Sequence, residues 1–331
     1  MNAPLAPWVA AQTRQLLKQR GHAWLLAGPS GLGQYHLALA MVRAWLCDNP
    51  SEQGACGSCT SCHAIDVHAH ADLCVLMPET VMLEQGWPLS EKAQAELDAK
   101  TRKPSKEIRI EAMRDAVEFS QRTSARNRGK AVLVFPAERM NVVTANALLK
   151  TLEEPPGDVK FVLASEAADQ LLPTIRSRCL VHTMIWPDTQ DSLAWLRQQG
   201  LASAQAAVLL RAAGGRPEDA LAFSQSGRDA QSWVRLPQAM ARGDLSVFKD
   251  WSPPQVMDAL HKLCHDLLAT KVGADPRFFD RADLPEGGSV ARLTAWSREL
   301  TASTRTVEHP FSPGLMLEAL VSQAQIALNS K

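Results

Sequence analysis

Short apolar runs alternate with amphipathic segments along the first part of the chain. Five runs have the length and composition of buried β-strands, and they lie at 22–28, 72–78, 130–136, 160–165 and in the second half of 171–186. Segments with apolar residues at helical spacing separate these runs, at 8–20, 36–47, 107–122 and 144–154. Strands that alternate with helices predict an α/β domain built on a parallel sheet.

The pattern changes after Pro187, where no further strand is expected and Ala and Leu recur at helical spacing. Breaks divide this region into helices, near Gly214, near Gly243 and across 273–289. We therefore predict an α/β domain, a small helical domain and a larger all-helical domain, at 1–186, 187–228 and 229–331.

Composition narrows the possible functions. The chain has 331 residues, enough for two or three domains, of which 46% are hydrophobic and 21% are charged, as in globular proteins. Lys plus Arg and Asp plus Glu both number 35, whereas a protein that holds DNA by itself usually has a basic excess.

The N-terminal segment does not have the basic start and apolar core of a signal peptide. No run is long enough to span a bilayer, and we expect a cytoplasmic protein.

A glycine-rich turn joins the first predicted strand to the next helix, as in a phosphate-binding loop. A working loop reads G-x-x-x-x-G-K-[ST]: its amides cradle phosphate, its Lys offsets phosphate charge and its hydroxyl holds Mg²⁺. Gly28, Gly31 and Gly33 keep this spacing, but Gln34 stands at the Lys position and Tyr35 at the hydroxyl position. Gln has no charge and a phenol is too large to replace a small hydroxyl. The motif therefore predicts a degenerate, non-functional ATP site.

The end of the third predicted strand supports the same conclusion. An acidic pair at this place holds Mg²⁺ and orients water in active phosphate-loop enzymes. Here Pro136 and Ala137 occupy those positions, and Glu138 is the one acidic residue nearby. We expect no ATP hydrolysis by this chain and no strong ATP binding. Weak nucleotide binding stays open, because amides at a helix start attract anions.

A cysteine cluster follows the helix after the glycine loop. Cys47, Cys56, Cys59 and Cys62 have the spacing C-x8-C-x2-C-x2-C, which suits four thiolates around one structural Zn²⁺. Free surface thiols and replacement of one ligand by His63 are the alternatives. The residues between these cysteines include no Lys or Arg, so we expect the module to be structural and not to bind nucleic acid.

Two further motifs follow: 146–156 reads NALLKTLEEPP and 177–179 reads SRC. The glycine loop, the cysteine cluster and these two motifs follow one another along the chain. In this order they resemble the bacterial DNA polymerase III clamp loader family. The similarity covers about 1–186 well and the helical remainder in outline. It implies an AAA+ fold with an inserted zinc module, a helical lid and a helical collar through which subunits associate.

Departures from the family pattern distinguish its branches. The gamma/tau ATPase branch keeps the loop Lys and the acidic pair, so this chain is more similar to the delta prime branch, whose own ATP site is inactive. Glu218 stands where an active relative has its sensor-2 Arg. The segment before the second strand has Ala71 in place of the family's usual Pro. A polar stretch at 79–105 forms an insertion, expected to be exposed and helical near 90–100, and we assign it no role.

The resemblance gives Arg178 a role in trans. In ring-shaped ATPases an Arg of one subunit reaches the γ-phosphate bound by the next and offsets charge as the bond breaks. Arg176 is the local competitor for this arginine finger. The implied partners are gamma/tau and delta in a hetero-pentamer within the DNA polymerase III holoenzyme, a DNA-directed DNA polymerase. The complex would load the beta sliding clamp onto primer-template DNA.

Other interpretations remain open at the level of sequence. The chain is alternatively an active gamma-like phosphate-loop ATPase or a stand-alone zinc DNA-binding protein. Three charged residues near the end of the 144–154 helix either face a neighbouring subunit or form a solvated surface: Lys150, Glu153 and Glu154. Basic residues before the third strand are candidates for phosphate contacts with DNA: Arg122, Arg126, Arg128 and Lys130.

Overall fold

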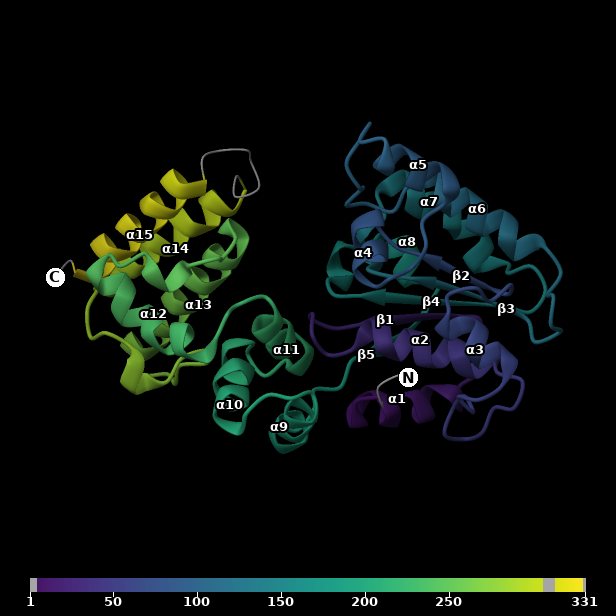
Figure 1. Ribbon diagram of the computed structural model, residues 1–331, viewed down its shortest axis with the longest axis horizontal. Coiled ribbons are helices and arrows are strands. Elements are labelled where there is room, and N and C mark those ends of the chain that lie inside the picture. Colours follow the sequence, from purple (N-terminus) through teal and green to yellow (C-terminus); the bar gives the residue numbers. More distant parts are fainter. Residues whose placement is uncertain (1–4, 306–312, 330–331) are drawn as a thin grey trace. The chain divides into compact units, whose positions relative to one another are not determined.

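The computed structural model describes residues 5–305 and 313–329 (Figure 1). The chain forms two compact units, one ending at Pro187 and the other beginning at Asp188. Residues 1–4, 306–312 and 330–331, which belong to the first and last predicted domains, lie outside the described residues. The division of the helical part into two domains stays a prediction.

The first unit is built on a sheet of five parallel strands, which confirms the predicted α/β class. The strand order is β2-β3-β4-β1-β5. The strands span Ala23–Ala27 (β1), Leu73–Leu76 (β2), Lys130–Val134 (β3), Val159–Ser165 (β4) and Leu180–Thr183 (β5). Because all strands run in the same direction, their carboxyl ends and the loops that follow them share one edge of the sheet.

Helices cover both faces of this sheet (Figure 1). Those of the first unit span Pro7–Leu17 (α1), Gln34–Leu46 (α2), Thr60–Asp66 (α3), Glu79–Glu84 (α4), Glu91–Asp98 (α5), Ile110–Gln121 (α6), Val142–Glu153 (α7) and Pro173–Arg176 (α8). Helices α1 and α2 lie on one face, and α6 and α7 lie on the other. Side chains from α6 and α7 complete an apolar core with β1, β3 and β4, including Met113, Leu148 and Phe161. The insertion contains α4 as well as the expected helix near 90–100.

The regular elements described in the second unit are all helices, as the Ala- and Leu-rich pattern predicts. Its helices span Thr189–Gln198 (α9), Ser203–Ala212 (α10), Pro217–Gln225 (α11), Ala230–Arg242 (α12), Pro253–Lys271 (α13), Val290–Thr304 (α14) and Pro313–Asn329 (α15). Trp233 anchors the packing, with its ring stacked on Phe279 at 4.7 Å between centroids. In neither unit do the described helices include one long and apolar enough to cross a membrane.

A buried carboxylate ties the start of β2 to the loop before β3. Asp72 has no exposed surface. It accepts hydrogen bonds from Ser124 Oγ at 3.0 Å, from the Ala125 amide at 2.8 Å and from the Arg126 amide at 2.9 Å. Lys130 Nζ lies 3.7 Å from its Oδ1. Burial opposes ionisation, but the amide and hydroxyl donors and Lys130 outweigh it and lower the pKa of Asp72 below its ordinary 3.8.

We expect Asp72→Asn to lower the free energy of unfolding by about 3 kcal/mol at neutral pH, because it leaves Lys130 buried without its counter-charge. The folded pKa of Asp72 is depressed, so its contribution is complete above the unfolded pKa and is lost as pH falls through the folded pKa. Urea unfolding at pH 7 and in acid measures the effect. The difference in unfolding free energy between the variant and wild type should become smaller in acid. Asp158→Asn, which changes an exposed carboxylate, is the matched control. Equal stability at pH 7 would contradict the prediction.

Candidate functional site

The glycine loop follows β1 and leads directly into α2. Gly31 and Gly33 have positive φ values of 75° and 93°, which suit glycine, and Gly33 is the N-cap residue of α2. A Cβ on Gly28 would lie 2.8 Å from Met184 Cβ, so no side chain fits at this position. The three glycines named from sequence therefore form the predicted turn. The loop is closely packed on the residues that follow β5.

Gln34 folds back over the loop that precedes it. Its side-chain Nε2 donates hydrogen bonds to the carbonyl oxygens of Gly28 at 2.8 Å and Pro29 at 2.6 Å. The residue is only 2% exposed. A Lys at this place would extend its charge toward a bound phosphate. Both N–H groups of the Gln34 amide are instead used to close the loop on itself.

Tyr35, at the Mg²⁺-binding position of the motif, is part of an aromatic contact. Its hydroxyl accepts a hydrogen bond from Trp87 Nε1 at 2.7 Å, and its ring centroid lies 5.3 Å from that of Phe135, the residue after β3. The phenol is 7% exposed, and burial raises its pKa. The hydroxyl is thus engaged by an indole from the insertion. A small hydroxyl able to hold Mg²⁺ is not available at this position.

Trp87 contacts the candidate site and was not among the site residues predicted from sequence. It lies in the insertion between α4 and α5, and its indole stacks on the His68 ring with centroids 3.9 Å apart. His68 Nδ1 is also 2.8 Å from the carbonyl oxygen of Gly86. These contacts fasten the insertion beside the glycine loop. A large aromatic residue within a polar segment was the signal available from sequence.

Glu138, the remaining acidic residue after β3, faces the end of β4. Its carboxylate accepts hydrogen bonds from Ser165 Oγ at 2.8 Å and from the Glu166 amide at 3.2 Å. Ala137, at an acidic position of the active pattern, is fully buried. The described residues at this strand end therefore form a packed connection to β4 and provide no acidic pair.

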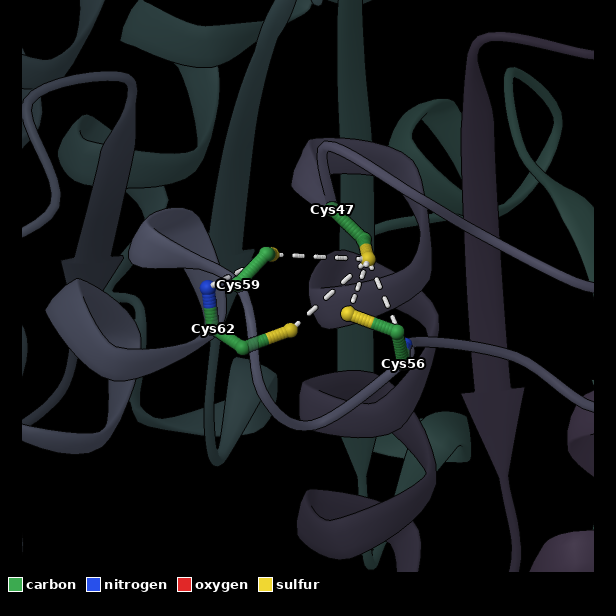
Figure 2. A group of neighbouring side chains, drawn as sticks. All are labelled: Cys47, Cys56, Cys59 and Cys62. Carbon is green, nitrogen blue, oxygen red and sulfur yellow. Dashed lines mark hydrogen bonds between the residues drawn. The ribbon is translucent and has the colours of Figure 1, made fainter.

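The four cysteines converge at the carboxyl end of α2 (Figure 2). Their Sγ atoms all lie within 4.8 Å of one another. Cys47 Sγ is 3.5 Å from Cys56 Sγ and 3.7 Å from those of Cys59 and Cys62. A tetrahedron of sulfurs around zinc, with bonds of about 2.3 Å, has edges of about 3.8 Å. The four thiols are thus placed to hold one metal ion, and His63 is not part of this group.

Backbone donors and burial give Cys47, Cys56 and Cys62 different acidities. Amide donors of Ser58 and Cys59 lower the pKa of Cys56 to about 6, whereas burial raises the pKa of Cys47 and raises that of Cys62 to about 12. The Cys56 amide donates to Cys47 Sγ at 3.3 Å, and the Cys62 amide donates to Cys59 Sγ at 3.4 Å. Buried thiolates need a cation to compensate their charge, so the donor set fits a divalent metal ion.

The basic loop before β3 binds the cysteine module within the chain. Arg128 Nη2 donates to the Cys47 carbonyl oxygen at 2.6 Å, and Arg126 Nη1 donates to Thr60 Oγ1 at 2.7 Å. Lys130 is buried beside Asp72, with its Nζ 3.8 Å from the centroid of the Phe119 ring. Arg122 forms a surface ion pair with Glu118 at 2.6 Å. All four basic residues considered for DNA contact have partners within the chain.

Arg178 lies between α8 and β5, half-buried, and it forms an ion pair with Glu153 at the end of α7. Arg176, Lys150 and Glu154 are exposed. Glu218 lies in the first turn of α11, in the second unit. The structure thus brings the glycine loop, Tyr35 and Glu138 to the carboxyl edge of the sheet, and the four cysteines to the far end of α2.

Comparison with known proteins places the chain in a family. The model of the family described as DNA polymerase III, delta subunit, matches residues 10–185, more than half of the chain. The chain therefore belongs to the DNA polymerase III delta subunit family.

Relatives with established names agree with this assignment. DNA polymerase III subunit delta' of Pseudomonas aeruginosa is 40% identical over 196 residues, which cover 59% of this chain and 53% of that protein. Subunit delta' of Escherichia coli is 32% identical over 241 residues, covering 71% of this chain and 65% of that protein. The chain thus spans about half to two thirds of the length of these relatives. A gamma subunit-related protein from Thermotoga maritima has the same fold, with a TM-score of 0.50 and 16% identity over 97% of this chain and 99% of that one.

We expect Tyr35→Phe to lower the free energy of unfolding by about 1–3 kcal/mol, because it leaves the buried Trp87 N–H without an acceptor. Trp87→Phe removes the donor, and the double variant removes both partners. Urea unfolding of the three variants measures the coupling. The loss of unfolding free energy in the double variant should be smaller than the sum of the losses in the two single variants. Additive costs would show that the two side chains do not interact.

Proposed function

We propose that the chain is an ATPase-inactive subunit of the delta prime type in a DNA polymerase III clamp loader. The observation that carries the proposal is the side chain of Gln34, which closes the loop where an active enzyme presents Lys to phosphate. The Tyr35–Trp87 contact and the absence of an acidic pair in the described segment after β3 support it. The similarity to relatives named subunit delta' supports the same functional class.

The proposal implies an AAA+ architecture. The α/β unit would carry the inactive ATP site, and the helical unit would supply a lid at 187–228 and a collar at 229–331. The collar would hold the chain in a hetero-pentamer with gamma/tau and delta. That complex would place the beta sliding clamp on primed DNA. Contacts with DNA would come mainly through the complex, since the net charge is zero and the basic loop is used internally.

The cysteine cluster would bind structural Zn²⁺. Cys47, Cys56, Cys59 and Cys62 would supply all four ligands, and the closed set leaves no position for a substrate. The ion would cross-link residues 47–62, a segment too short to form a core of its own. Since Arg128 and Arg126 bind this segment, zinc would also support the loop before β3.

Arg178 would act on the ATP site of the neighbouring subunit. Its guanidinium is planar, permanently charged and suited to phosphate, and it is partly exposed beyond the end of α8. It would offset charge on the γ-phosphate during hydrolysis in gamma/tau. The chain would thus lack catalysis at its own loop and contribute to catalysis elsewhere.

We expect the purified chain to contain one zinc per molecule, measured by elemental analysis. Cys62→Ser should lose the metal, because three thiolates at this site leave the ion's coordination open, and the variant should be cleaved faster by protease within 47–62. Cys74→Ala, which changes a thiol outside the cluster, is the control and should keep the metal. Zinc should also be lost as pH falls, because protons compete for the sulfurs. Full zinc content in Cys62→Ser would contradict the site.

We expect clamp loading by gamma/tau and delta to require this chain, while the chain alone turns over no ATP. Arg178→Ala should fold and keep its zinc but reduce hydrolysis at the neighbouring site by a factor on the order of 10³. ATP turnover and clamp placement on primed DNA measure the two effects, with Arg176→Ala as the control. Turnover by the isolated chain would favour an active ATPase instead.

A further inference from the structure

Arg178 is held by groups from two helices. Its Nη2 is paired with the carboxylate of Glu153, the last residue of α7, and its Nη1 donates to the Thr174 carbonyl oxygen of α8 at 2.9 Å. Nη1 also lies 3.4 Å from Ser177 Oγ. Nε is buried and has no hydrogen-bond partner among the described residues. The guanidinium therefore has a defined place at the surface and does not sample solvent freely.

The neighbouring charged residues are not held in this way. Arg176 is exposed and forms no ion pair with any residue in the described part of the chain. Glu154, next to Glu153, is exposed and likewise contacts no described cation. The side chain of Arg178 is 28% exposed and that of Glu153 is 51% exposed, so the pair lies at the surface with one side open to a partner.

We propose that Glu153 is a positioning residue for Arg178, an inference that rests on the proposed arginine-finger role. An Arg side chain loses conformational entropy when it is held in one rotamer. A carboxylate that holds it in that rotamer before it meets phosphate removes this entropy loss from the catalytic step. A guanidinium has five N–H donors. The contacts to Thr174, Ser177 and Glu153 occupy three of them. Two remain: the buried Nε–H, and one N–H of Nη2, which is the donor left for a phosphate oxygen.

The carboxylate would also keep the guanidinium from folding onto other surface acids before the complex assembles. Because the pair is partly exposed, its contribution is moderate, as for other solvent-accessible ion pairs. Glu153 would not touch the nucleotide. Its effect would pass entirely through Arg178, and this dependence is the property that a test can measure.

The test uses the assembled complex with gamma/tau, delta, clamp and primed DNA, in which ATP turnover is measured against ATP concentration. Four forms of this chain are compared with wild type: Glu153→Gln, Arg178→Ala, the double variant, and Glu154→Gln as the matched control. Glu153→Gln should lower kcat about two- to fivefold, the upper part of the range of a surface ion pair. KM for ATP should be unchanged, and Glu154→Gln should match wild type. On the Arg178→Ala background, Glu153→Gln should have no further effect.

Two results would overturn the inference while leaving the finger role in place. One is wild-type turnover by Glu153→Gln when Arg178→Ala is impaired. The other is an equal loss from Glu153→Gln with and without Arg178, which would assign Glu153 a role of its own. If Arg178→Ala itself turned over ATP at the wild-type rate, the finger role and the inference would both fail. Zinc content and urea unfolding confirm that each variant is folded.

Discussion

The burial of helix α2 against the sheet is the constraint on which both candidate sites depend. Nine of its thirteen residues are buried, including Gln34 and Tyr35 at its start and Leu46 at its end. The residue before the helix is the last glycine of the loop, and the residue after it is the first cysteine of the cluster. A rotation or shift of α2 would therefore disturb the loop and the metal ligands together. The apolar surface of one helix fixes the geometry of two chemically unrelated sites.

Much of the first unit could be predicted because its strands are buried on both faces. Such strands appear in the sequence as continuous apolar runs, and β3 and β4 match runs that stand out from polar surroundings. The cysteine cluster could be predicted for another reason. Its ligands lie within sixteen residues of one another, so short-range spacing alone brings them together. The loss of the loop Lys and hydroxyl could likewise be read directly from residues 34 and 35.

Contacts between residues distant in sequence could not be predicted. Trp87 meets Tyr35 across 52 positions, and no local pattern specifies that meeting. Arg126, Arg128 and Lys130 resemble a series of phosphate-binding residues in the sequence because their partners lie far away along the chain. Asp72 is more than fifty residues from the loop that it binds, and Cys47 is 81 residues from Arg128. The sequence shows which charges are present, but the fold decides which are neutralised.

The Tyr35–Trp87 contact also bears on the evolutionary history of the chain. The Tyr35 hydroxyl accepts a hydrogen bond from the Trp87 indole of the insertion. Replacement of Tyr35 by a residue with a small hydroxyl would leave the buried indole N–H without an acceptor and leave space beside Phe135. A single reversion would thus cost stability before it restored any chemistry. If the ATP site is inactive, as proposed, the contact with the insertion would make that loss of nucleotide chemistry hard to reverse. Selection on this chain would then act on its surfaces and its partners, and no longer on an ATP site of its own.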